Sequence, residues 1–241
     1  MAGTFLLITL YLQLVVGLSP LRAGLWLVPM NVAMVVSTML APQLGRRFRP
    51  GPVMAAGLAV AAAGLLLLTQ TGAVGGLPVV VVGFTLACVG IAAPTALGVN
   101  LIMGTVPPEK AGTASGISET SGEFGIALGV AVLGSIGTVV YRAQINLPPD
   151  LPAGDATTAG ESITGAASVA GQLPAGAAEN LITGAREAFT AGLNVAGGAG
   201  AALLAALAVV ALAAFGRLRP TGETQPAELE PDAPARATSS R

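Results

Sequence analysis

Histidine is missing from this sequence of 241 residues, and cysteine occurs once, at Cys88. Without histidine, the chain lacks the commonest general base, the commonest metal ligand and the usual side chain of a switch near neutral pH. A single cysteine excludes an internal disulfide, and its place in an apolar run indicates a small buried or lipid-facing residue. No metal-ligand set, no Ser/His/Asp set and no G-x-x-x-x-G-K-[ST] loop occurs. We therefore expect no cofactor, no metal and no ATP-driven motor.

Charged side chains are also scarce, at 10% of residues, whereas 53% are hydrophobic and the mean hydropathy is +0.77. A soluble domain carries about 25% charged residues because water must solvate its surface. The net charge of −1 provides no basic field for nucleic acid. The composition therefore predicts an integral membrane protein with the lipid bilayer as its main partner.

Six apolar runs approach the length of about 20 residues that a membrane-spanning helix needs. They cover residues 3–18, 23–44, 53–70, 77–103, 114–140 and 189–215. The first run barely crosses a hydrocarbon core of about 30 Å. It predicts either a short helix or a chain that continued upstream, and we favour truncation. The predicted fold is all-α, a bundle of six transmembrane helices within residues 1–216.

Two regions fall outside these runs. Residues 141–188 form a long connection with a turn-rich start and weak helical periodicity near its end, which allows either one or two short helices or a floppy loop. Residues 217–241 are rich in proline, alanine and charge and have almost no large apolar side chain. Such a tail cannot bury enough surface to fold, so we expect it to be disordered.

The positive charges of the connections predict the orientation of the bundle. Alternate connections carry Arg46, Arg47, Arg49, Lys110, Arg217 and Arg219. By the positive-inside rule this side is cytoplasmic, which puts both termini inside the cell and the 141–188 connection outside. Arg22, in an outer connection, is a mild counter-signal. The expected location is the plasma membrane.

Glu119 and Glu123 are the most informative polar residues, because they lie within the fifth apolar run. Their spacing of four residues puts both on one helical face. A charge at the bilayer midplane costs at least about 2.5–3.5 kcal/mol, so we expect this face to line a polar cavity. Neighbouring carboxylates repel when both are ionised, which suits binding of protons or of a cation. Two alternatives stay open: acids near the cytoplasmic interface, or structural partners of Lys110 or of another helix.

The remaining polar residues of the apolar runs carry weaker signals. Gln13, Asn31 and Asn100 are candidates for lining a cavity, although an interhelical hydrogen bond is the more common role of any one such residue. Arg46 and Arg47 follow Gly45 at a helix end. They are candidates for a cytoplasmic latch, by which we mean a conformation-dependent pairing with acids or helix C-termini, or else for charges at the lipid headgroups.

Glycines at a spacing of four residues, as in Gly112–Gly116 and Gly125–Gly129, predict that helices approach closely. Gly192, Gly197, Gly198 and Gly200 in the last run carry the same prediction. The pattern is common in membrane proteins, so it indicates packing and not a particular function.

Several segments resemble the major facilitator superfamily, in particular the fourteen-span drug:proton antiporters that export quaternary ammonium compounds. Residues 11–13 (YLQ) and 17–24 (GLSPLRAG) resemble the start of that family's C-terminal domain. Residues 44–47 (LGRR) resemble its cytoplasmic loop signature without the aspartate. Residues 106–135, which contain Glu119 and Glu123, are similar to its penultimate span. The resemblance implies that both acids act in proton coupling and cation recognition.

The resemblance also implies an incomplete machine, since such transporters have two six-helix domains around one cavity. A half is not expected to transport alone, because alternating access moves one half against the other. The predicted partners are therefore a missing N-terminal half or another copy, together with protons and a small lipophilic or cationic substrate. The alternatives are a non-transporting membrane scaffold or accessory subunit and, less in keeping with the missing histidine, a membrane-embedded enzyme.

Overall fold

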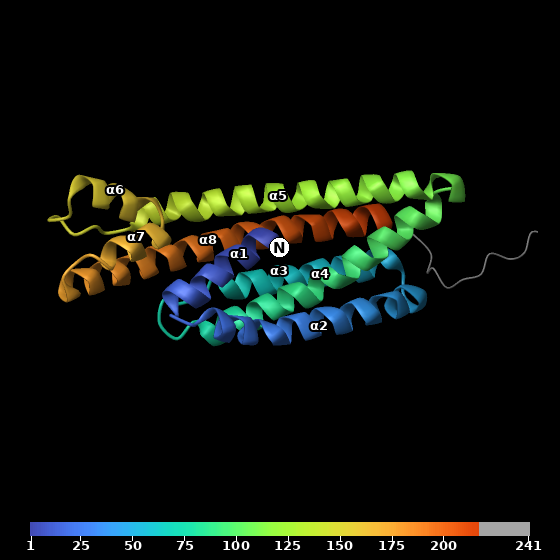
Figure 1. Cartoon of the computed structure of the whole chain (residues 1–241). Coiled ribbons are helices and arrows are strands. Elements are labelled where there is room, and N and C mark those ends of the chain that lie inside the picture. The colour runs from blue at the N-terminus through green and yellow to red at the C-terminus, as the bar shows by residue number, and fades with distance from the viewer. Residues whose placement is uncertain (217–241) are drawn as a thin grey trace, which may run out of the picture.

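The computed structural model describes residues 1–216, and the expected disorder of residues 217–241 lies outside them. Over the described part the chain is all helical, as predicted, and no strand occurs in it (Figure 1). The elements are α1 (Ala2–Leu10), η1 (Tyr11–Val15), α2 (Pro20–Arg47), α3 (Pro50–Leu68), α4 (Leu77–Thr105), η2 (Pro108–Lys110), α5 (Ala111–Gln144), α6 (Ala153–Glu161), α7 (Ile163–Ala170) and α8 (Ala175–Phe215).

Within residues 1–216, the five helices α2, α3, α4, α5 and α8 are long and apolar enough to cross a membrane. The first predicted run forms a shorter apolar helix, Ala2–Val15, whose last turn is a π-helix. Its 14 residues span about 21 Å at 1.5 Å per residue, which is less than the hydrocarbon core. The structure therefore has the expected six apolar helices, but only five of them reach spanning length.

The connection before the last helix is shorter than residues 141–188. Helix α5 continues to Gln144 and α8 begins at Ala175, because Leu181, Ala185 and Ala188 form a buried stripe on its first turns. The intervening residues form the short helices α6 and α7, so they are not a floppy loop. The Tyr141 hydroxyl of α5 donates a hydrogen bond to the Ala159 carbonyl of α6 at 2.9 Å, which ties these helices to the bundle.

Close backbone contacts build the centre of the bundle from α3, α4 and α8. A Cβ on Gly57 of α3 would lie 2.6 Å from the Gly90 carbonyl oxygen of α4 and 2.8 Å from the ring of Pro94, so only glycine fits there. A Cβ on Gly197 of α8 would lie 3.2 Å from the Leu65 carbonyl oxygen of α3. The sequence-based expectation of close packing is thus met in α8.

Helices α2 and α5 lie at opposite edges of the bundle (Figure 1). In the most apolar window of each helix, 50% of the α3 residues are buried, against 17% in α2 and 11% in α5. Large apolar side chains such as Leu21, Met39 and Phe124 therefore remain exposed on these two edge helices. In a bilayer, such faces contact either acyl chains or another protein.

Candidate functional site

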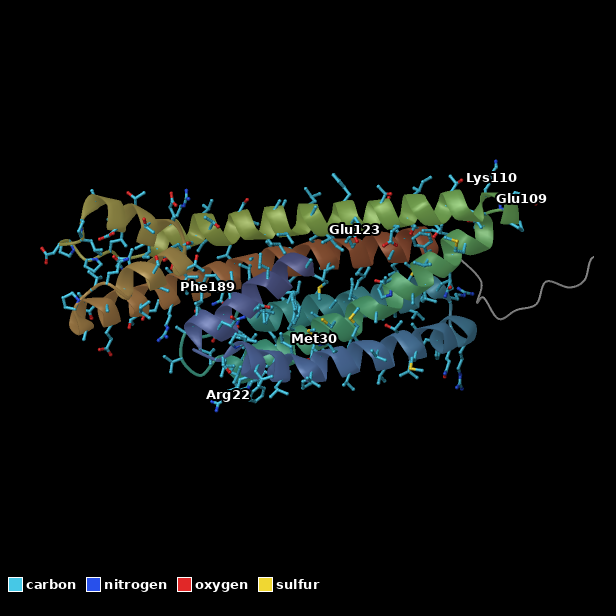
Figure 2. All side chains as sticks on the ribbon, viewed as in Figure 1. Arg22, Met30, Glu109, Lys110, Glu123 and Phe189 are labelled. Carbon is cyan, nitrogen blue, oxygen red and sulfur yellow. The ribbon has the colours of Figure 1, made fainter. Side chains whose placement is uncertain are left out.

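The acid pair lies on the first half of α5. Glu119 and Glu123 are four residues apart on this continuous helix, so they share a face, and both side chains are exposed. Among the side chains that the structure describes, which exclude that of Arg46, neither carboxylate forms an ion pair, and Lys110 is not their partner. Figure 2 shows Glu123 partway along α5, well separated from Glu109 and Lys110 at the end of the helix.

No helix of the described part of the chain approaches the backbone of α5 closely at the glycines around the acids. A Cβ placed on Gly112, Gly116, Gly122 or Gly125 would meet no atom within 4 Å. The predicted close contact at Gly112–Gly116 is therefore wrong within this chain. The prediction of a close approach is correct at the second glycine pair, Gly125–Gly129. A Cβ on Gly3 of α1 would lie 2.6 Å from the Gly129 carbonyl oxygen.

The other candidates for lining a cavity do not join the acids in one cluster. Asn31 is exposed on α2, and its Nδ2 donates to the Leu27 carbonyl of the same helix at 2.9 Å, so it makes no interhelical bond there. Asn100 is exposed on α4, and Gln13 is half-buried in η1. Helix α4 packs closely on α2 and only lightly on α5. These residues are spread over η1, α2, α4 and α5.

The two arginines of the predicted latch lie in the last turn of α2, next to Gly45. The Arg47 side chain is exposed, and among the residues that the structure describes it pairs with no acid. The end of α2 lies at the same end of the bundle as Lys110 (Figures 1 and 2).

A set of interior polar contacts is not foreseen from the sequence. The Tyr11 hydroxyl donates to the Gly72 carbonyl at 2.6 Å, Arg186 Nε donates to the Leu14 carbonyl at 3.0 Å, and Asn194 Nδ2 donates to the Thr71 carbonyl at 3.0 Å. These bonds join η1, the α3–α4 turn and α8. The sequence predicted no role for Arg186, because this residue lies within the predicted 141–188 connection. The apolar spacing of Leu181, Ala185 and Ala188 is the signal that places it on a helix.

No group of three or more Cys, Asp or Glu side chains that could hold a metal lies within residues 1–216. The acid pair on α5 offers exposed carboxylate oxygens, and its chemistry is that of binding a proton or an organic cation. Its helix and the bundle behind it define the class: a multi-pass helical membrane protein.

Comparison with known proteins identifies the family. A model of the Major Facilitator Superfamily matches residues 1–130, which include both acids, and the chain belongs to this superfamily. It is 36% identical over 212 residues to "Multidrug efflux pump LfrA" of Mycolicibacterium smegmatis, a match that covers 88% of this chain and 41% of that protein.

Two further relatives extend the pattern. The chain is 31% identical over 235 residues to "Tetracenomycin C resistance and export protein" of Streptomyces glaucescens (94% of this chain, 43% of the relative). It is 33% identical over 215 residues to "Methyl viologen resistance protein SmvA" of Salmonella typhimurium (87% of this chain, 42% of the relative). The chain thus spans about two fifths of the length of these curated relatives.

Proposed function

We propose that this chain is the C-terminal half of a proton-coupled multidrug exporter for lipophilic or cationic compounds, and that it is inactive alone. The observation that carries the proposal is the exposed pair Glu119 and Glu123 on a largely exposed stretch of α5. The relatives, more than twice as long, are multidrug pumps, resistance proteins or export proteins. A truncated chain of this kind works with a separate N-terminal half or with another copy.

The geometry of α5 supports acids at membrane depth. If the 34 residues of α5 are centred in the bilayer, Glu119 lies about 13 Å and Glu123 about 7 Å from the midplane, at 1.5 Å per residue. Both distances are within the half-thickness of about 15 Å of the hydrocarbon core. Ionised carboxylates at that depth are costly facing lipid, so the second half provides the wall of a polar cavity here.

The coupling mechanism follows from competition for one site. An ionised Glu119 or Glu123 attracts a cationic substrate, and protonation of the same carboxylate removes that attraction. Protons arriving from outside therefore favour release of the cation, and loss of the proton inside favours its binding. The two halves rock between inward and outward states around this fixed pair.

We also propose that the protein lies in the plasma membrane and that both of its termini are cytoplasmic. Arg47, Arg49 and Lys110 lie at the end of the bundle opposite to Arg22 (Figure 2). Arg142 of α5 and Arg186 of α8 lie at the same end as Arg22, which weakens the charge bias without reversing it.

The test is efflux of ethidium from cells that co-express this chain with a matching N-terminal half. We expect efflux only when both halves are present, and we expect Glu119→Gln together with Glu123→Gln to abolish it. Glu109→Gln, in η2 outside the helix, is the matched control and should leave efflux unchanged. Retained efflux in the double variant, at equal protein levels, contradicts the role of the acids.

The second candidate function is a non-transporting scaffold or accessory subunit. The exposed apolar side chains of α2, such as Leu21 at 75% and Met39 at 71% exposure, favour it because they offer a wide surface for another membrane protein. A scaffold predicts stable association with that protein, no efflux with any N-terminal half, and no effect of the two Glu→Gln changes.

A further inference from the structure

Two largely apolar hollows adjoin on the face of the bundle where α1 packs on α5. The first, of about 150 Å³, is bordered by the junction of α6 and α7 (residues 161–164) and by Phe189 of α8. The second, of about 420 Å³, continues along α5 towards the middle of that helix. Leu6, Gly134 and Thr138 line both hollows, so the two form one continuous groove, which we call the α1–α5 groove. Helices α6 and α7 mark its end of the bundle in Figure 1.

One acid and one cation border the α1–α5 groove. Glu161, the last residue of α6, lines the first hollow, and Arg142, in the last turn of α5, lines the second. Both side chains are exposed, and no described side chain within residues 1–216 forms an ion pair with either of them. They do not pair with each other. A ligand that carries both a negative and a positive group can therefore pair with both side chains at once.

The groove extends from the hydrocarbon core to the level of the lipid headgroups. If α5 is centred in the bilayer, Gly134 lies about 10 Å and Arg142 about 22 Å from the midplane, at 1.5 Å per residue. The hydrocarbon ends at about 15 Å from the midplane and the headgroups at about 20–22 Å. Glu161 borders the same hollow as Tyr141, the neighbour of Arg142 in the sequence, so both charges lie near headgroup level. The apolar part of the groove lies beside the acyl chains.

We propose that the α1–α5 groove binds one phospholipid with a zwitterionic headgroup that ends in a primary ammonium, as in phosphatidylethanolamine. The Arg142 guanidinium donates to the phosphate, and the Glu161 carboxylate accepts hydrogen bonds from the ammonium. One acyl chain lies along Leu6 and Gly134. An anionic phospholipid brings no cation to Glu161, and a quaternary ammonium donates no hydrogen bond to it. The site goes beyond the proposed function, and only its leaflet, the outer one, rests on the orientation proposed above.

The test measures lipid binding to the delipidated full chain in mild detergent by native mass spectrometry. Phosphatidylethanolamine, phosphatidylcholine and phosphatidylglycerol with the same acyl chains compete at equal concentrations. We expect one retained phosphatidylethanolamine per chain and a preference of about three- to fivefold over each competitor, the size of effect typical of one exposed charge pair. Equal binding of the three lipids means a non-selective lipid shell only and overturns the proposal.

Substitution of the two charges tests the role of each. Glu161→Ala removes the acceptor of the ammonium and should make phosphatidylethanolamine and phosphatidylcholine bind equally. Glu179→Ala, at an exposed acid of α8 that does not line the groove, is its control and should keep the preference. Arg142→Gln should weaken binding of all three lipids about three- to fivefold, whereas Arg22→Gln, at an exposed arginine of the same end, should not. Without lipid, neither charge of the groove has a ligand, so none of the four changes should shift the Tm.

A change in the wall of the groove tests where the acyl chain lies. A Cβ on Gly134 would meet no atom within 4 Å, so Gly134→Leu fits the fold and fills the groove. It should lower phosphatidylethanolamine binding, and Gly134→Val serves if the leucine variant does not fold. Gly116→Leu is the control, because a Cβ there also meets no atom and the residue does not line the groove.

Three results overturn the proposal: a preference that survives Glu161→Ala, binding that survives both changes of Gly134, or stronger retention of phosphatidylglycerol. The last result assigns the groove to an anionic lipid held by Arg142 alone. None of these measurements involves efflux. A chain that selects the lipid yet exports nothing with any N-terminal half contradicts the proposed function alone, and an active pair without lipid selectivity contradicts this inference alone.

Discussion

Gly3 of α1 lies directly against the backbone of Gly129 of α5, and a Cβ on Gly3 would come within 2.6 Å of the Gly129 carbonyl oxygen. The two residues are 126 positions apart along the chain. Their contact joins the short first helix to the edge helix that carries the acid pair. It therefore fixes where the start of α1 lies along α5.

The first prediction concerns this contact. Gly3→Val forces α1 away from α5, because the valine side chain overlaps the Gly129 backbone. We expect a loss of about 1–3 kcal/mol of stability, typical of overpacking, measured by thermal or denaturant unfolding in detergent. Gly116→Val is the control, since a Cβ there meets no atom within 4 Å, and it should change stability little. Equal losses in both variants would contradict the contact.

The second prediction concerns the Tyr11 hydroxyl, which donates to the Gly72 carbonyl at 2.6 Å. Tyr11→Phe keeps the ring in the core and leaves that carbonyl without this donor, so we expect a loss of about 0.5–1.5 kcal/mol. Thr95→Val serves as the comparison, because the exposed Thr95 hydroxyl bonds only the Ile91 carbonyl of its own helix. An unchanged Tm in Tyr11→Phe would show that the bond adds nothing.

A third prediction tests the link between Arg186 and Leu14, 172 residues apart, in which Arg186 Nε donates at 3.0 Å. Arg186→Ala removes a charged donor from a part-buried carbonyl at the end of η1. We expect a loss of about 1.5–3 kcal/mol, as for hydrogen bonds of charged groups. Unfolding in denaturant measures it.

Arg142→Ala is the matched control for Arg186→Ala. Arg142 is an exposed arginine at the same end of the bundle and pairs with no acid within residues 1–216. A comparable loss of stability in both variants would mean that the effect belongs to surface charge and not to the Arg186–Leu14 bond.

The fourth prediction concerns the orientation of the helices in the membrane. It is tested by labelling single introduced cysteines in a Cys88→Ala background. Val74 lies in the α3–α4 turn and is 94% exposed, and Phe48 lies between α2 and α3 and is 54% exposed. We expect Val74→Cys in intact cells to react with a membrane-impermeant maleimide, and Phe48→Cys to react only after the membrane is opened. The reverse pattern would place both termini outside.

The native Cys88 provides an internal check of these labelling experiments. It is 5% exposed within α4, so its thiol should react much more slowly than the thiol of Val74→Cys in folded protein. Denaturation should abolish that difference, because burial is its cause.

Much of the fold could be predicted from the sequence because the bilayer sets a simple length rule. The apolar runs at 53–70 and 77–103 agree with α3 (Pro50–Leu68) and α4 (Leu77–Thr105) to within a few residues. The last helix begins 14 residues before the predicted run, since its first turns, Ala175–Ala188, contain charged residues and alanine instead of a continuous apolar run. One stripe of these turns, Leu181, Ala185 and Ala188, is buried, and α7 packs on α8, a tertiary contact that hydropathy does not record.

The candidate site was likewise predictable from the sequence only in part. The spacing of Glu119 and Glu123 predicted a shared helical face, and they lie on one continuous helix. Whether Gln13, Asn31 and Asn100 join them depends on which helices adjoin. Their distribution over η1, α2 and α4 could not be read from spacing along the chain.

The sequence by itself determined that this protein is a helical membrane protein, how many apolar helices it has, and that two acids share one of them. Only the tertiary structure decided that α3 lies inside the bundle while α5 lies at its edge. The apolar windows of these helices have almost equal mean hydropathy, 2.1 and 2.0, yet 50% of the residues are buried in one and 11% in the other. The reason is that lipid tails are as apolar as a protein core, so hydrophobicity brings a helix into the membrane without choosing its neighbours. That choice was made by close contacts such as Gly57 on Gly90, where shape and not polarity decides which helices meet.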